Sequence, residues 1–261
     1  MSRSLGAALA LLAVSVTLSA EEQPAEAAAL GADWRHWTAD TQIENLPSLQ
    51  RGARNFMAYC YGCHSLKFLR YQRMADDLKI PGEQLQQYLL PPGAKSTDYV
   101  ITPMPAQRAA DWFGKAPPDL SLIARARGTD YLFRFLTTFY ADTKSVGTGV
   151  NNLALPGTAM PHVLSPLQGV QQAVFQNVEK PGEDGKPMMV AEFAHFEPGA
   201  NGSLDNAQYR EFVRDTVNFL DYAGEPSRLG RGNVGVWTVL FLLLFTVVAW
   251  LLKHEYWKDV R

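Results

Sequence analysis

The sequence predicts a mainly α-helical domain with long loops, followed by one C-terminal transmembrane helix. Apolar residues recur at helical spacing in several segments between residues 48 and 223, proline- and glycine-rich stretches separate these segments, and residues 234–252 form an uncharged apolar run. Of the 261 residues, 47% are hydrophobic and 19% are charged, which provides material for a packed core and argues against disorder. The 24 basic and 26 acidic residues leave no basic excess, which argues against nucleic-acid binding.

The N-terminal segment predicts export. Arg3 is followed by an apolar run without charge over residues 5–20, and two glutamates end this run. This order describes a secretory signal peptide over residues 1–20, with cleavage after Ala20. An uncleaved N-terminal anchor is the alternative.

The middle of the chain predicts helices separated by irregular segments. Helices are expected over residues 48–59, after Thr129 as N-cap, and over residues 205–223, with Gly224 and Pro226 at the end. Residues 98–118, which are proline-rich at both ends, are expected to be irregular. Gly182 and Asp184-Gly185 predict a hairpin or loop over residues 179–188. Long loops are uncommon without a purpose, and wrapping a large cofactor would be one.

The C-terminal apolar run predicts a membrane-spanning helix. Residues 234–252 contain 19 positions without a charge, and a helix of that length spans about 28 Å, close to the thickness of the hydrocarbon layer. Aromatic residues lie near both ends, where the membrane interface favours them. A buried core helix is the alternative. We therefore expect an exported domain over 21–228, a linker and anchor over 229–252, and a cytoplasmic tail over 253–261.

The two cysteines form the motif that predicts chemistry. Cys60-Tyr61-Gly62-Cys63-His64 has the C-x-x-C-H pattern of c-type haem attachment. Two thiols three positions apart can reach the two vinyl groups on one edge of a porphyrin, and His64 then directs its imidazole toward the iron. A thioredoxin-like site would need a neighbouring βαβ pattern, and a structural zinc site needs four ligands. A plain disulfide is the remaining alternative.

The residues alone leave the sixth iron ligand open. A single-haem electron carrier has Met or His on the far side of the porphyrin, and His/Met ligation raises the reduction potential. Met104 and Met160 are both loop methionines beside prolines, and they are equal candidates on this pattern. His162 and His195 are the histidine candidates, whereas Met57 lies one turn from the motif and on its wrong side.

Several segments, in this order, resemble the cytochrome c1 family. They are residues 60–65, residues 116–121, the pairs 124–125 and 130–131, residues 156–161, and the pairs 219–220 and 225–226. The similarity covers residues 34–257, including the C-terminal anchor. It implies a mainly α-helical c-type cytochrome domain with long loop insertions, plus one C-terminal transmembrane helix.

The resemblance also assigns residues to one haem c. Cys60 and Cys63 would carry it covalently, His64 would be the proximal iron ligand, and Met160 would be the distal one. Arg125 and Tyr131 match an arginine and a tyrosine near the haem in the family.

Arg125 is thus expected to pair with a haem propionate, against the alternative of a surface arginine. The second ring nitrogen of His64 is expected to donate to the carbonyl of Pro117 or Pro118.

The implied function is electron transfer within the ubiquinol–cytochrome c reductase (bc1) complex, with no bond chemistry on this chain itself. One electron would come from a Rieske iron–sulfur protein and pass to a soluble cytochrome c, with cytochrome b as a further partner. The chain would cross the cell inner membrane once and hold its haem domain in the periplasm. Acidic residues within 179–205 are expected to steer a basic partner, against the alternative of a solvated loop. A membrane-tethered cytochrome c serving a terminal oxidase or another respiratory enzyme, and a haem-based sensor with an open sixth site, are the alternatives.

Overall fold

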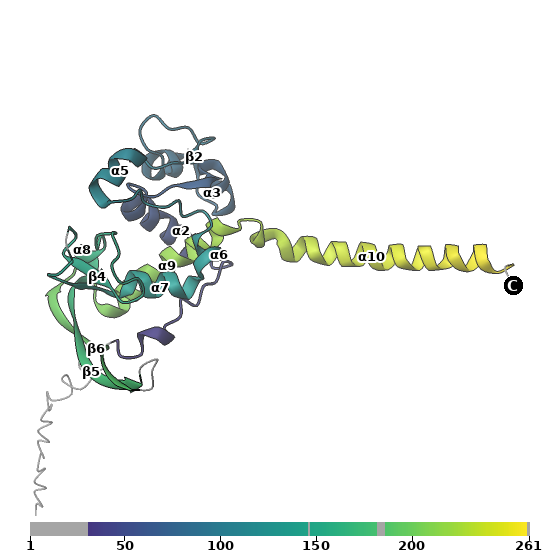
Figure 1. Cartoon of the computed structure of the whole chain (residues 1–261). Helices are drawn as coiled ribbons and strands as arrows, with labels where there is room; N and C mark the ends of the chain where they lie inside the picture. Colours follow the sequence, from purple (N-terminus) through teal and green to yellow (C-terminus); the bar gives the residue numbers. More distant parts are fainter. Residues whose placement is uncertain (1–30, 146, 182–185, 260–261) are drawn as a thin grey trace, which may run out of the picture.

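Two packed helices form the centre of the molecule, α2 (Leu46–Asn55) and α9 (Asn206–Gly224). They are shown in the computed structural model, which describes residues 31–145, 147–181 and 186–259 (Figure 1). Gly52 is required where they meet, because a Cβ there would lie 2.1 Å from the Asp215 carbonyl oxygen. Beside this contact, the Arg51 Nε lies 2.5 Å from the carboxylate of buried Asp215, so an ion pair also joins the two helices.

The remaining elements surround this pair. The other helical segments are η1 (Trp34–His36), η2 (Phe56–Cys60), α3 (Tyr71–Asp77), α4 (Gly82–Gln84), η3 (Leu85–Leu89), α5 (Ala106–Phe113), α6 (Ile123–Arg127), α7 (Thr129–Thr137), α8 (Ser165–Gln168) and α10 (Arg228–Trp257). The strands form antiparallel pairs, β1 (Leu66–Arg70) with β2 (Tyr99–Val100), β3 (Phe139–Ala141) with β4 (Val150–Asn152), and β5 (Gly169–Pro181) with β6 (Pro187–Asn201). The fold is mainly helical, which confirms the predicted class.

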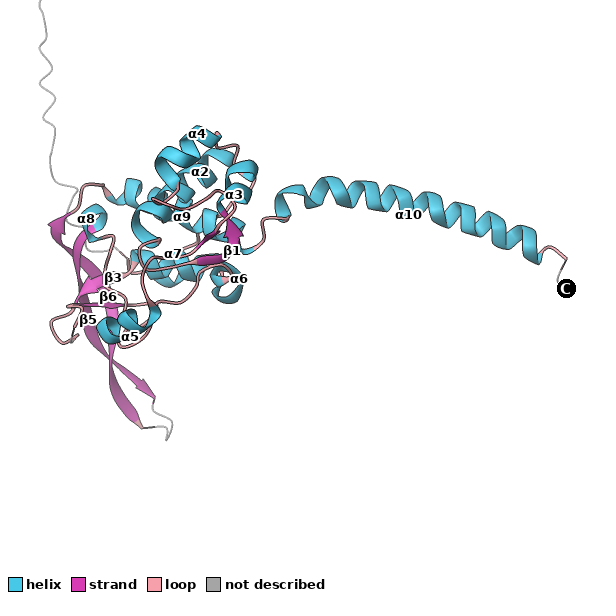
Figure 2. Cartoon of the chain, turned by 90° about the horizontal axis from the view of Figure 1, so that it is seen from above, coloured by secondary structure: helices cyan, strands magenta, loops and turns pink. Residues whose placement is uncertain are grey.

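The β5–β6 hairpin projects from the helices (Figure 2). The expected hairpin over 179–188 is confirmed as the outer end of this pair, while its predicted turn residues Gly182 and Asp184-Gly185 lie outside the described residues. The strands are much longer than predicted. Phe193 and Phe196 bury against Trp34 at the base of the hairpin, and this packing depends on residues distant in sequence.

Most of the predicted helices are confirmed, with shifted ends. The Asp205 side chain accepts from the backbone amide of Gln208, and the Gln208 side chain accepts from the backbone amide of Asp205. This capping box begins α9, which ends at Gly224 as predicted. Thr129 is the first residue of α7 rather than its N-cap, because Gly128 with φ of +87° makes the turn before it. The expectation of an irregular segment over 98–118 is wrong in part, since that segment contains β2 and α5.

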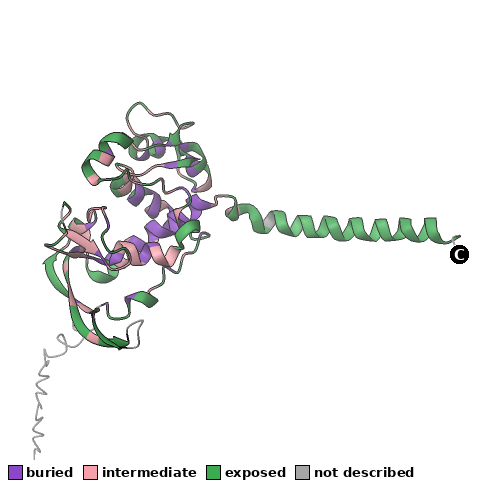
Figure 3. Cartoon of the chain, in the orientation of Figure 1, coloured by how far each residue is buried: buried purple, intermediate pink, exposed green. Residues whose placement is uncertain are grey.

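The buried residues gather around α2 and α9, whereas α10 is exposed over residues 234–257 (Figure 3). Helix α10 has 30 residues and an 18-residue window of mean hydropathy 2.4, and it is the one helix in the described part of the chain that is long and apolar enough to cross a membrane. Gly230 and Gly232, expected in a linker, lie inside this helix. The predicted signal peptide, residues 1–20, lies outside the described residues.

Candidate functional site

Helix α2 continues into the π-helical turn η2, and the cysteine motif begins at Cys60, the last residue of η2. Such turns are rare and occur often at functional sites. The next turn is closed by bonds from the Cys63 and His64 amides to the Cys60 carbonyl, 3.0 and 2.9 Å long. This local winding brings both cysteines and His64 to the wall of one cavity.

The His64 ring is oriented by a backbone carbonyl. Its Nδ1 lies 2.8 Å from the oxygen of Pro118, which confirms the expected proline contact. If Nδ1–H donates to Pro118, the lone pair of Nε2 remains for a metal. Burial lowers the pKa of His64 below its usual value, with the Pro118 bond opposing this shift, so the neutral, ligating form is favoured.

The segment that contains Pro118 is fixed to the chain just after the motif. The Leu120 amide donates to the Ser65 carbonyl at 2.9 Å, and Asp119 accepts from the Lys67 amide at 2.9 Å. Ser121 is buried, and its hydroxyl accepts from the Phe68 amide at 3.2 Å. The position of the Pro118 carbonyl is therefore set by three contacts with residues 65–68.

The cavity is lined mostly by apolar side chains from α7, α9 and the loops between the elements. Besides the motif, its lining includes Phe113, Pro117, Leu120, Ile123, Leu132, Phe135, Leu136, Leu155, Val163, Leu164, Phe212 and Leu220. Burial raises the pKa of the Cys60 thiol to about 12 and also raises that of Cys63. The two cysteines are free thiols in the structure, so they form no disulfide there.

Met160 lines the cavity together with the two cysteines and His64, and Met104 does not. The Met160 amide bonds the hydroxyl of Thr158 at 3.3 Å. Neither histidine candidate is in the lining: His162 stacks on Phe139 with ring centroids 4.9 Å apart, and His195 lies in β6, near Glu197. The structure thus brings one of the two candidate methionines to the motif.

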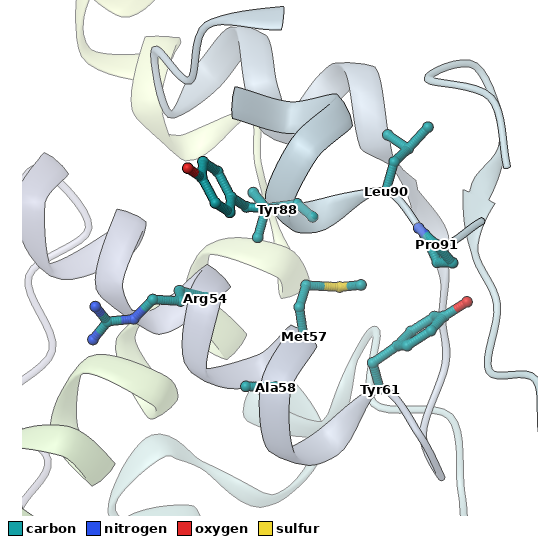
Figure 4. Close-up of a pocket in the computed structure, with 8 residues that line it drawn as sticks. Arg54, Met57, Ala58, Tyr61, Tyr88, Leu90 and Pro91 are labelled. Carbon is teal, nitrogen blue, oxygen red and sulfur yellow. The ribbon is translucent and has the colours of Figure 1, made fainter. Parts of the chain in front are cut away.

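Met57 lies on a different face of η2 from the cysteines. It lines a second, shallower pocket with Tyr61, Tyr88 and Pro91, and Figure 4 shows its side chain extended into that space. This agrees with the sequence-based exclusion of Met57 as an iron ligand.

Arg127, rather than Arg125, reaches the cavity. Tyr131 and Arg127 both line it, and the Arg127 guanidinium lies 5.4 Å from the centroid of the Tyr131 ring. Arg125 is absent from the lining, and its side chain, 59% exposed, lies 3.7 Å from the carboxylate of Glu225. The structure therefore does not bring Arg125 to the site. The sequence offered no signal for Arg127, because α6 presents both arginines within one turn.

The donor set fits a covalently bound c-type haem. Two thiols, an oriented imidazole and a thioether border one apolar space, and a cation lies at its lining. A protein zinc site does not fit, because the described residues contain no cluster of three or more His, Cys, Asp and Glu side chains. Apolar residues of α7 and α9 line this cavity, and helical periodicity in the sequence cannot tell a face that packs on protein from one that packs on a cofactor.

Comparison with known proteins gives one family and several similar relatives. Residues 37–260 match the model of the Cytochrome C1 family. The chain is 43% identical over 224 residues to cytochrome c1 of Allochromatium vinosum, covering 86% of this chain and 89% of that protein. It is 40% identical over 214 residues to the ammonia monooxygenase gamma subunit of Nitrosomonas europaea, with 82% and 84% covered. Cytochrome c1 of Rhodospirillum rubrum is 26% identical over 257 residues, with 88% and 87% covered.

Proposed function

This chain belongs to the cytochrome C1 family, and from that premise we propose that it carries one electron from a Rieske iron–sulfur protein to a soluble cytochrome c. Family membership makes the chain a membrane-anchored, haem-bearing electron-transfer subunit of a bc1-type complex. The observation that carries the proposal is the meeting of Cys60, Cys63, His64 and Met160 around one apolar cavity. When bound, the haem supplies an iron centre that exchanges single electrons.

Each residue of the site has a distinct task in this proposal. Cys60 and Cys63 would hold the porphyrin by thioether bonds, and His64 would present Nε2 to the iron while the Pro118 carbonyl orients its ring. Met160 would supply the sulfur ligand of the iron, and a His/Met pair would raise the reduction potential. Phe135 and the other apolar side chains of the lining keep water from the cavity, and such burial is a further determinant of the potential.

Arg127 is the cation that we assign to the haem propionates, in place of Arg125. It lies at the cavity lining and beside Tyr131, whereas Arg125 is directed to Glu225. A guanidinium pairs well with a carboxylate because its N–H groups form a planar fork. Glu225 also pairs with Arg231 of α10, so Arg125 belongs to the charged cluster where α9 meets the anchor.

The proposed topology puts the haem domain in the periplasm. Residues 1–20 direct export, α10 crosses the inner membrane, and residues 253–261 stay in the cytoplasm. Cytochrome b and the Rieske protein are the proposed partners within the membrane complex. Steering of a basic partner by residues 179–205 stays a prediction, and two of its acidic side chains already lie near cations or a histidine, Glu192 near Lys180 and Glu197 near His195.

The purified membrane complex tests this function most directly. We expect the mass of this chain to exceed its polypeptide mass by one haem, a reduced-minus-oxidised spectrum with both c-type and b-type bands, and co-purification of a dihaem cytochrome b. Reduction by ubiquinol should be followed by reduction of added cytochrome c. Co-purification with a terminal oxidase instead, or binding of carbon monoxide by the reduced wild-type haem at neutral pH, would contradict the proposal.

A further inference from the structure

The loop that carries Met160 is held by side chains rather than by a helix or strand. No regular element covers residues 153–164, between β4 and α8. A loop of this kind needs other partners for its backbone amides where it is buried. The partners come from Asn151, Asn152 and Thr158, which we call the Met160 clamp.

Asn152 is the centre of the clamp. It is fully buried at the end of β4, and its Oδ1 accepts from the amides of Ala154 and Leu155 at 2.9 and 3.1 Å. Its Nδ2 donates to the carbonyl of Phe135 at 2.7 Å. One amide group therefore joins the start of the loop to α7, whose Phe135 side chain lines the cavity.

Asn151 and Thr158 hold the rest of the loop. The Oδ1 of Asn151 accepts from the Gly157 amide at 2.8 Å, at a turn where φ of +75° favours glycine. Thr158 is buried, and its hydroxyl accepts from the Met160 amide at 3.3 Å. The three side chains of the clamp thus hold four amides of the loop, those of Ala154, Leu155, Gly157 and Met160 itself.

We infer that the Met160 clamp, with Asn152 at its centre, consists of positioning residues that keep the Met160 sulfur at the iron. This rests on the proposed role of Met160 as distal ligand. Loss of the Asn152 side chain removes the partner of two part-buried amides, those of Ala154 and Leu155, and of the Phe135 carbonyl. The start of the loop then loses its bond to α7, and its amides turn toward water for new partners. Movement of the loop carries Met160 away from the cavity, so the sixth position opens more often.

The test is an Asn152→Ala variant in the assembled, haem-loaded complex. Three readouts report on the iron–sulfur bond: the weak long-wavelength absorption band of methionine-ligated ferric haem, the reduction potential, and carbon monoxide binding to the reduced haem. We expect a weaker band, a lower potential, and a roughly tenfold rise in the fraction of haem open to carbon monoxide, which is the low end of the net contribution of the three hydrogen bonds lost. Wild-type behaviour in all three readouts would overturn the inference.

Asn218→Ala is the matched control. Asn218 is also buried and makes three side-chain bonds, two with the backbone of Gln42 and one with the Ser48 hydroxyl, on the side of α9 away from the cavity lining. This variant should lose stability and keep the three readouts of the wild type. Equal opening of the sixth position in both variants would show a general loosening and would contradict a specific clamp.

Two threonine variants keep the inference testable if Asn152→Ala fails to accumulate. Thr158→Val keeps the shape but removes the acceptor for the Met160 amide, and it should open the sixth position. Thr158→Ser keeps the hydroxyl and should restore the wild-type readouts; no difference between the two would overturn the clamp.

A parallel Met160→Leu variant separates the two proposals. If this variant keeps the methionine band, the ligand assignment fails. If it loses the band while the clamp variants keep it, only the clamp fails.

Discussion

The cysteine side of the cavity continues a packed helix, whereas the methionine side is a loop held by side-chain amides. Cys60 ends η2 directly after α2, and α2 is fixed to α9 by the close contact at Gly52. Met160 lies in a segment whose backbone bonds are made largely with Asn151, Asn152 and Thr158. Covalent attachment of the haem therefore depends on helix packing, whereas ligation of the iron by Met160 depends on side-chain hydrogen bonds to a loop. A substitution should be able to disrupt one without the other.

The largest expected effect is on attachment. A Cys60→Ser, Cys63→Ser double variant should carry no covalent haem, because these are the two cysteines of the chain. Intact mass and haem staining after denaturation measure this loss. Met160→Leu is the control and should keep the covalent haem; retention of haem by the double serine variant would show that attachment does not depend on these thiols.

The next effect concerns the helix contact under the cysteine side. Gly52→Ala would set a Cβ 2.1 Å from the Asp215 oxygen and 2.6 Å from the Phe219 Cβ, so α2 and α9 must separate. We expect a loss of about 3 kcal/mol in the free energy of unfolding, as for overpacking of a tight core. Denaturant unfolding of the full chain in detergent measures it.

Gly82→Ala is the control for that variant. A Cβ at Gly82 meets nothing within 4 Å, so its effect should be near zero. A similar loss in both variants would mean that the α2–α9 contact is not specially tight.

The hydrogen bond of Tyr209 in α9 to the cavity wall should contribute less to the stability of the protein, and its contribution should depend on pH. The buried Tyr209 hydroxyl donates to the Leu136 carbonyl at 2.7 Å, and burial raises the pKa of Tyr209. Above its unfolded pKa of about 10, the unfolded chain loses this proton and the folded chain keeps it, so stability falls as pH rises.

Tyr209→Phe should cost about 1 kcal/mol at neutral pH, where the Leu136 carbonyl loses its partner. It should also make the alkaline loss of stability less steep. Unfolding measured between neutral and alkaline pH checks both; an unchanged alkaline slope would contradict the assigned role of Tyr209.

The smallest expected effect is on the reduction potential, and it should differ between the two arginines of α6. A cation near the haem favours the reduced form, so Arg127→Gln should lower the potential. Exposure screens the charge, and we expect about 0.5 kcal/mol, or about 20 mV for one electron. Arg125→Gln should leave the potential unchanged in the same redox titration, and the reverse result would restore Arg125 to the propionates.

The two sides of the cavity also differ in how far the sequence predicts them. The cysteine motif and the α9 helix follow from local patterns, and the α9 helix is confirmed in the structure. The expected contact of His64 with a proline carbonyl is also confirmed, at Pro118, although it joins segments distant in the sequence. The choice between Met104 and Met160, the cavity position of Arg127 and the length of the β5–β6 hairpin depend on contacts between distant segments. Residue pattern alone does not record such contacts, and for Met160 the family resemblance supplied what the pattern could not.

The central claim is that one haem lies between His64 and Met160. The most direct measurement is the long-wavelength band of methionine-ligated ferric haem, recorded in the purified complex for Met160→Leu and, as a matched control, Met104→Leu. Both are loop methionines beside prolines, but only Met160 lines the cavity. The account predicts that the band is lost in Met160→Leu and kept in Met104→Leu; a band kept in the first variant and lost in the second would contradict it.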